Sequence, residues 1–312
     1  MTEAVRAVFL GSGAFAVPVV ESLANSPGVD LVSLVTAPTK PGPRGRPTDV
    51  PVAQWAMEHG LPLLRPPRLR AAESIAELAA LTPDLLVLAD YGQIVPAALL
   101  DLPKFGALNL HPSLLPRHRG ASPIPATILA DDAETGVSLM LMDAGLDSGP
   151  LIARRRVALS GTETAPDLEH ALAIVAAELL TTSLPSWLNS ELVALPQAEE
   201  GVTLTKPLRR SDGSINPRES VDQLERQVRA YQPWPGTFFT AGGMRVVVWK
   251  ARIADDAPQG SIGQLVRVGS GGIGLVCEGL LELLEVQPAG GRRMSGEELA
   301  RGRTGIIGSV IE

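Results

Sequence analysis

The sequence has 312 residues, of which 45% are hydrophobic and 20% charged, and its formal net charge is −7. This composition excludes a disordered or fibrous chain, and the length leaves room for two domains with buried cores. The single cysteine, Cys277, excludes an internal disulfide and predicts a cytoplasmic protein. We expect no membrane span, because glycine and proline interrupt the longest uncharged apolar stretch, residues 7–20.

Short apolar runs alternate with amphipathic helical patterns in the first half of the chain. This alternation is typical of βαβ units, so the predicted fold class is α/β with a mostly parallel sheet. Strands are expected at residues 5–10, 31–35, 85–89, 107–110, 137–142 and 151–157, and helices at residues 17–24, 52–59, 73–81 and 168–182.

The pattern becomes irregular and rich in proline and glycine near residues 184–201. The predicted domains are therefore residues 1–188 and 206–312, joined by a linker of residues 189–205. The second domain is expected to form a small β-barrel or sandwich. Its predicted elements are a helix at residues 221–230 and strands at residues 245–250, 263–268, 274–277 and 280–286.

The first polar motif, Gly11-Ser12-Gly13-Ala14-Phe15-Ala16, has the glycine spacing of a dinucleotide-binding turn. The second predicted strand ends in Thr36-Ala37-Pro38, however, and supplies no carboxylate for a ribose. The motif is therefore open to three interpretations: a dinucleotide site, a phosphate at a helix N-terminus, or a tight turn.

The second polar motif follows the strand at residues 107–110, at the edge where open α/β sheets bind ligands. Strand alternation places Asn109 and His111 on one side, and Asp147 lies in the glycine-rich loop of residues 145–149. These three groups, without a serine or cysteine nucleophile, suit acyl transfer in which the amine of the substrate attacks. Asn109 and a protonated His111 would hold the oxyanion, and Asp147 would raise the pKa of His111.

The alternative is that His111 is an ordinary loop histidine and Asp147 a turn former. A metal site is not predicted, because the four histidines include no H-x-x-x-H pair and the only cysteine is isolated.

Several motifs together resemble the folate-dependent formyltransferase family. In the first domain they are Asn109-x-His111, residues 113–117, Arg119-Gly120, residues 134–137, residues 145–149 and residues 89–96. Residues 231–235 and 287–294 are similar to the C-terminal domain of the members that act on tRNA. The resemblance thus covers nearly the whole chain, although His118 stands where the family more often has an aromatic residue.

The resemblance implies a Rossmann-like domain that binds 10-formyltetrahydrofolate and passes its formyl group to the methionine amine of initiator methionyl-tRNA. It implies catalytic roles for Asn109, His111 and Asp147, no metal, and an OB-like barrel that helps hold the tRNA. We expect a monomer. The implied folate contacts are Ser113, Leu114, Leu115, Pro116, Ala89, Tyr91 and Gly92, and the implied tRNA contacts are Arg44, Arg46 and Lys206.

The distribution of charge is compatible with an RNA partner. Residues 1–204 carry 13 basic and 22 acidic side chains, whereas residues 205–312 carry 14 basic and 12 acidic ones. The acidic excess therefore lies in the first part, and phosphates could dock on the second part or on the loop of Arg44. Two alternatives remain at this stage: a sugar-nucleotide N-formyltransferase, and a non-catalytic dinucleotide- or RNA-binding module.

Overall fold

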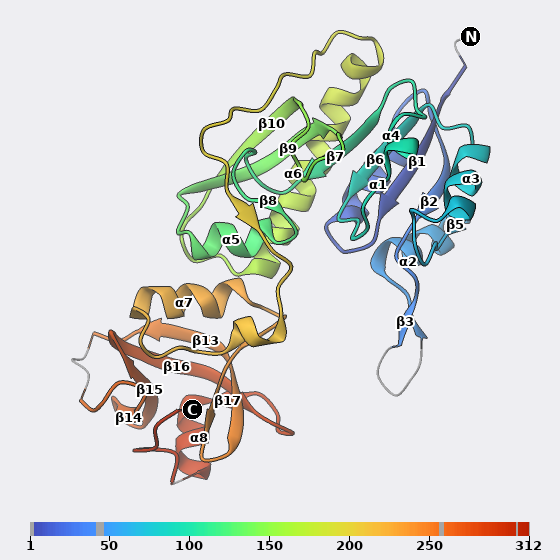
Figure 1. Ribbon diagram of the computed structural model, residues 1–312. Helices are drawn as coiled ribbons and strands as arrows, with labels where there is room; N and C mark the ends of the chain where they lie inside the picture. The colour runs from blue at the N-terminus through green and yellow to red at the C-terminus, as the bar shows by residue number, and fades with distance from the viewer. Residues whose placement is uncertain (1–2, 42–46, 256–258, 304, 312) are drawn as a thin grey trace. The chain divides into compact units, whose positions relative to one another are not determined.

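The computed structural model describes residues 3–41, 47–255, 259–303 and 305–311 (Figure 1). The chain divides into two compact units by its internal contacts. The first unit consists of residues 1–123, 134–158 and 168–206, and the second of residues 124–133, 159–167 and 207–312.

The first unit contains a seven-stranded sheet with the order β10-β9-β7-β6-β1-β2-β5. Five neighbouring strands are parallel, and β9 pairs antiparallel with both β7 and the edge strand β10. The predicted α/β class with a mostly parallel sheet is confirmed. The strands are β1 (Val5–Gly11), β2 (Val29–Val35), β5 (Leu63–Leu64), β6 (Leu85–Ala89), β7 (Ala107–His111), β9 (Glu134–Leu141) and β10 (Leu151–Ala158).

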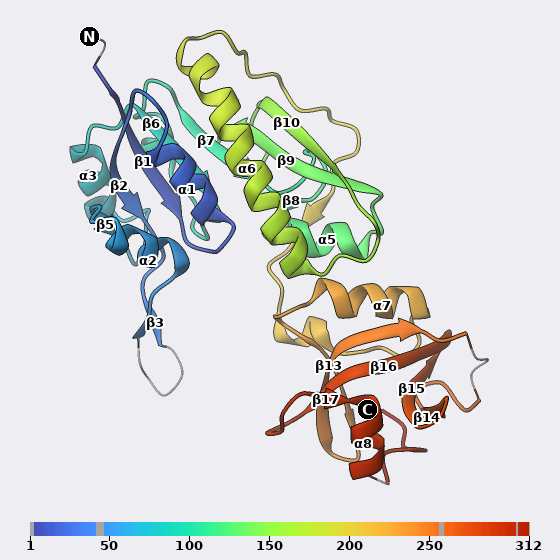
Figure 2. The ribbon, with the colours of Figure 1, turned by 180° about the vertical axis from the view of Figure 1, so that it is seen from behind.

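Helices α1 (Ala16–Ala24), α2 (Pro51–Glu58), α3 (Ala72–Ala80), α4 (Ala97–Leu100) and α6 (Ala165–Leu188) belong to this α/β fold. On one face of the sheet, Leu78 of α3 and Leu99 of α4 pack in a core cluster with Val8 and Leu86. Helices α1 and α6 lie beside one another (Figure 2), and the hydroxyls of Ser22 and Thr181 are 2.6 Å apart. These buried layers explain why the central strands are continuous apolar runs.

Helix α6 is long and apolar enough, by length and composition alone, to cross a membrane. Its buried positions Leu168, Leu172, Ala176 and Leu180 recur at helical spacing. A single buried stripe is typical of a core helix packed on a sheet. The helix continues through Pro185 and ends at Leu188, beyond the predicted end at residue 182.

Short strands complete the first unit. Strands β3 (Lys40–Pro41) and β4 (Pro47–Thr48) pair antiparallel on either side of residues 42–46. Strand β8 (Arg119–Gly120) pairs in parallel with β11 (Leu204–Thr205). The predicted linker therefore carries a strand that pairs within the first unit, while the domain boundary itself stays a prediction.

The second unit is built on an antiparallel half-barrel sheet with the order β12-β13-β16-β15-β14, and β17 pairs with β16. One core cluster includes Leu224 of the amphipathic helix α7, Phe239, Val248 and Leu283, and buried Cys277 belongs to it. The elements are α5 (Pro123–Leu129), the 3-10 helix η2 (Arg210–Gly213), α7 (Val221–Ala230), β12 (Thr237–Ala241), β13 (Met244–Ile253), β14 (Leu265–Val268), β15 (Gly272–Cys277), β16 (Gly279–Pro288), β17 (Met294–Ser295) and α8 (Gly296–Gly302).

Candidate functional site

Asn109 and His111 lie at the carboxyl end of β7, between β6 and β9. Asn109 is opposite Leu88 of β6 and Met140 of β9, and His111 is opposite Ser138 of β9. Alternation places both side chains on one face of β7. Asn109 is half-buried and His111 is 5% exposed, so the imidazole is largely removed from water.

Both ring nitrogens of His111 have a partner. Nδ1 is 3.6 Å from Oδ2 of Asp147, and Nε2 is 2.9 Å from the carbonyl oxygen of His118. Because a carbonyl only accepts hydrogen bonds, Nε2 carries a proton and donates it to His118. In the neutral ring, Nδ1 is then the unprotonated nitrogen, and it faces the carboxylate of Asp147.

Asp147 is positioned by its own backbone conformation and by a hydrogen bond from strand β8. Its φ is +48°, a left-handed conformation that aspartate adopts more readily than most residues. The backbone N–H of Gly120 donates to Oδ2 of Asp147 at 2.8 Å. The oxygen that faces His111 is thereby held in place by a backbone hydrogen bond.

The pKa of His111 is determined more by burial than by the two partners of the ring. Burial of the ring lowers this pKa below its ordinary value of 6.5, and the opposing effects of the Asp147 carboxylate and the His118 carbonyl are smaller. The expectation that Asp147 raises the pKa of His111 is confirmed for that interaction, and burial outweighs it. The resting imidazole is therefore neutral at pH 7, and a protonated His111 would arise only during the reaction.

The loop after β7 contains the predicted folate segment of residues 113–116. The Ser113 hydroxyl donates to the carbonyl of Arg117 at 2.7 Å. The Ser138 hydroxyl accepts from the Leu115 N–H at 3.1 Å and donates to the carbonyl of Ser113 at 2.7 Å. Ser113 and Leu115 are fully buried, so the structure shows these side chains supporting the loop that follows His111.

The other predicted folate residues follow β6, the strand next to β7. Ala89 ends this strand and is buried, Tyr91 is half-buried, and Gly92 is exposed. The Tyr91 hydroxyl is buried without a hydrogen-bond partner among the described residues, and burial raises the pKa of Tyr91 to about 12. Since β6 and β7 are parallel neighbours, their carboxyl ends bring this loop to the edge that carries His111.

The glycine motif at residues 11–16 forms a packed turn. The Oδ2 atom of Asp90 lies 1.7 Å from the place that a Cβ atom on Gly13 would occupy. The N–H of Phe15, at the start of α1, donates to the carboxylate of Glu169, whose pKa is raised by burial and by Asp90. Two carboxylates therefore occupy the helix N-terminus, which disfavours the dinucleotide and phosphate interpretations.

The predicted tRNA residues are placed only in part. Arg44 and Arg46 lie outside the described residues. Lys206 is exposed and directly follows β11, at the end of the first unit. The described part of the chain holds no group of three or more residues that could bind a metal ion.

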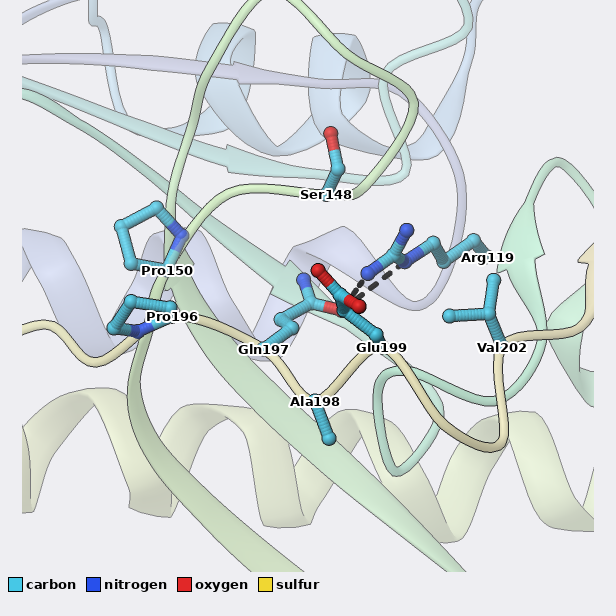
Figure 3. Close-up of a pocket in the computed structure, with 8 residues that line it drawn as sticks. All are labelled: Arg119, Ser148, Pro150, Pro196, Gln197, Ala198, Glu199 and Val202. Carbon is cyan, nitrogen blue, oxygen red and sulfur yellow. Dashed lines mark hydrogen bonds between the residues drawn. The ribbon is translucent and has the colours of Figure 1, made fainter.

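A pocket of about 420 Å³ lies beside the Asp147 loop (Figure 3). Arg119 points toward Gln197 there and donates two hydrogen bonds to its Oε1 atom. Gln197 lies in the predicted linker, where no sequence motif marks it. The pocket is lined by Arg119, Ser148, Pro150, Pro196, Gln197, Ala198, Glu199 and Val202.

Comparisons with known proteins define the class. Residues 5–184 match the formyl transferase family, and residues 207–304 match the formyl transferase C-terminal domain family. The fold resembles that of WlaRD, a sugar 3N-formyl transferase, with a TM-score of 0.65 and 15% identity over 90% of this chain and 96% of that one. Fold and matched domains together define a formyl transferase.

Full-length relatives narrow the class. The sequence is 42% identical to the methionyl-tRNA formyltransferase of Halorhodospira halophila, over 99% of this chain and all of that relative. It is 43% identical to the methionyl-tRNA formyltransferase of Thermus thermophilus, over 95% of this chain and 96% of that relative. The chain belongs to the methionyl-tRNA formyltransferase family.

Proposed function

We propose that the protein transfers the formyl group of 10-formyltetrahydrofolate to the amino group of methionine on initiator methionyl-tRNA, for translation initiation. The observation that carries this proposal is similarity from end to end, through both domains, to proteins named for this reaction. The buried His111 and Asp147 pair supplies the chemistry that such a transfer needs.

Formyl transfer to an amine builds up negative charge on an oxygen. The amine nitrogen bonds to the formyl carbon, the carbonyl oxygen becomes an oxyanion, and the bond to the donor nitrogen of the folate then breaks. Hydrogen-bond donors fixed in advance lower this barrier. In our proposal the half-buried amide of Asn109 is such a donor, at the end of a strand that holds it in place.

His111 would accept the proton that the amine loses. The resting ring is neutral with its proton on Nε2, so Nδ1 is free to take up a second one. A proton on Nδ1 would lie between the ring and the Asp147 carboxylate, where the opposite charges stabilise each other in a site with little water. The imidazolium would then pass the Nδ1 proton to the leaving nitrogen of the folate as its bond to the formyl carbon breaks, because the Nε2 proton is held by the His118 carbonyl.

The proposed folate residues differ in exposure, and this difference suggests a different part for each. Ala89 and Ser113 are buried, so their part would be to support the loop backbone. Gly92 is exposed, and nothing lies within 4 Å of the position where a Cβ atom would stand. The structural neighbour WlaRD, which was solved in the presence of 5-N-formyl-THF, supports a folate-type formyl donor.

One face of the second unit supports an RNA partner. Val246 and Val248 of β13 point into the core, so Arg245 and Trp249 lie on the opposite face of the sheet. Arg245 stacks on Phe238 at 3.4 Å from the ring centroid, and Arg293 stacks on Trp249 at 3.5 Å. Arginine and aromatic side chains on a sheet are suited to phosphates and unstacked bases.

The remaining tRNA contacts, Arg44, Arg46 and Lys206, form part of the same proposal. Their cationic groups would meet phosphates, and binding should therefore weaken as salt is raised. Translation initiation also implies a cytoplasmic enzyme, which fits the single buried Cys277, and we propose that it acts as a monomer.

The test is a formylation assay with charged initiator tRNA and 10-formyltetrahydrofolate. We expect the purified protein to formylate the methionyl-tRNA and to leave an amino-sugar nucleotide unmodified. Activity on the sugar nucleotide alone would favour the sugar N-formyltransferase alternative, to which the likeness is one of fold. An inactive wild-type protein that binds NADH and not a folate analogue would reverse the proposal in favour of a binding module.

A further inference from the structure

The segment between the two family-matched regions lies against the loops that contact His111. The matches end at residue 184 and resume at residue 207. Within this gap, residues 195–205, here called the strap, make backbone contacts at both ends. Leu195 exchanges backbone hydrogen bonds with Leu151 at 2.7 and 2.8 Å, and β11 pairs with β8.

Gln197 of the strap ties the Asp147 loop to β8. Its Nε2 atom donates to the backbone carbonyls of Asp147 and Gly149, both at 2.8 Å. Its Oε1 atom accepts from Nε and Nη2 of Arg119, at 3.1 and 2.7 Å. All hydrogen-bonding atoms of this amide are used, and the residue after Arg119 is Gly120, whose N–H binds the Asp147 carboxylate.

Thr203 of the strap holds the other partner of His111. Its Oγ1 atom accepts from the backbone N–H of His118 at 2.7 Å and lies 3.4 Å from Nδ1 of the His118 ring. Its carbonyl accepts from the N–H of Arg119 at 3.0 Å. The His118 peptide is therefore fixed on one side by Thr203, while its carbonyl receives the Nε2 proton of His111 on the other.

Both anchored residues have unfavourable backbone conformations. His118 has φ +56° and Asp147 has φ +48°. Conformations of this kind are costly for a residue with a side chain and persist only where the surrounding structure holds them. The strap supplies a side-chain hydrogen bond at each of the two positions, which explains how the partners of His111 keep their geometry.

We propose that Gln197 and Thr203 are positioning residues for formyl transfer, because they hold the Asp147 carboxylate and the His118 carbonyl against the two ring nitrogens of His111. This positioning role rests on the proposed function where the test measures formylation activity, and it does not where the test measures the His111 titration. The hydrogen bonds of both side chains go to the neighbours of His111, so both residues act through these neighbours.

The test uses Gln197→Ala and Thr203→Val, with Thr203→Ser as the conservative partner. Each disruptive variant is expected to lower kcat by about 10- to 100-fold, the usual effect of misplacing a reacting group by about 1 Å. The KM values for charged tRNA and 10-formyltetrahydrofolate should stay near those of the wild type, since the strap would position the proton-transfer groups. Thr203→Ser keeps the hydroxyl acceptor and should restore most of kcat.

A histidine NMR titration supplies a readout that needs no substrate. Asp147 and the His118 carbonyl both raise the pKa of His111, whereas burial and the His118 ring lower it. Loosening either partner should therefore move the His111 titration to lower pH. The matched control is Gln264→Ala, since Gln264 likewise links two loops, through Ser261 and Gly308 in the second unit. It should leave kcat and the titration unchanged.

The outcomes separate the two proposals. Wild-type kcat and an unmoved His111 titration in both Gln197→Ala and Thr203→Val would overturn the positioning role. If the wild-type protein has no formylation activity, the proposed reaction is rejected. A shift of the His111 titration in the two variants would still support the positioning role of the strap. Should Gln197→Ala not fold, Gln197→Glu removes the two amide donors while keeping an acceptor for Arg119, and the same loss of kcat is expected.

Discussion

Two aspartates in the first unit share a backbone conformation and differ in their partners. Asp90 follows β6 with φ +47°, and Asp147 follows β9 with φ +48°. Asp147 faces an imidazole and accepts a backbone N–H, whereas Asp90 fills the space above Gly13 and acts on the carboxylate of Glu169. The residue that each aspartate faces therefore determines its role. Next to an imidazole the carboxylate can take part in proton transfer, and next to a glycine turn it serves in packing.

The contrast predicts the largest effect at the His111 pair. His111→Ala and Asp147→Asn should each lower kcat by about 10²- to 10⁴-fold, the range expected when a proton-transfer group or a fixed charge is lost. Single-turnover formylation of charged tRNA measures this loss. Near wild-type rates in Asp147→Asn would make the two aspartates equivalent and remove the basis of the contrast.

An effect on stability is expected at the turn of residues 11–16, against which Asp90 packs. A methyl group on Gly13 would collide with Oδ2 of Asp90, so Gly13→Ala should destabilise the fold by about 1–3 kcal/mol, as overpacking usually does. Urea unfolding measures the change. The double variant Gly13→Ala/Asp90→Ala removes the colliding atom and should recover part of the loss, and strictly additive effects would show that the two residues are not coupled.

On the acid side, activity is expected to fall at a lower pH than an ordinary histidine would cause. Burial lowers the pKa of His111, so most of the imidazole is still neutral at pH 6.5. The value of kcat should therefore fall only when the pH drops further, through the lowered pKa. The unfolded chain binds a proton on this histidine at higher pH than the folded chain does, so the contribution of His111 to stability is present above pH 6.5 and lost as the pH falls through its folded pKa. A kcat profile with its acid limb above pH 6.5 would contradict the neutral resting ring.

The smallest effect is expected for Asp90→Asn. The amide keeps the shape of the side chain and removes one negative charge near Glu169, so the pKa of Glu169 should fall toward its ordinary value. The formylation rate should remain close to that of the wild type. A loss as large as that of Asp147→Asn would show that the Asp90 loop also takes part in the chemistry.

Local patterns were sufficient to predict most of the framework. Strand β6 and helix α7 have the predicted bounds, residues 85–89 and 221–230. The strand is a continuous apolar run that is buried throughout, and the helix is amphipathic and buried on its apolar side. Strand β12 was missed, since Thr237–Ala241 directly follows a proline-rich turn and is too short to show a clear alternation.

The site was predictable only where its chemistry lies on one strand or in one recognisable motif. Asn109 and His111 are two residues apart, so alternation alone brings them together. Gln197 binds Asp147 across 50 positions, and Thr203 binds His118 across 85, and such pairs leave no trace in local periodicity. The sign of the His111 pKa shift depends on burial, which a sequence motif does not report.

The lone Cys277 makes the molecule convenient for site-specific labelling. Burial raises the pKa of this thiol to about 11, so at neutral pH it remains protonated and nearly unreactive toward maleimides. A cysteine introduced at an exposed position such as Ile94, which is 85% exposed, would be the preferred target of a fluorophore or spin label. Probe measurements of this chain can therefore begin from its natural sequence, without first removing a competing thiol.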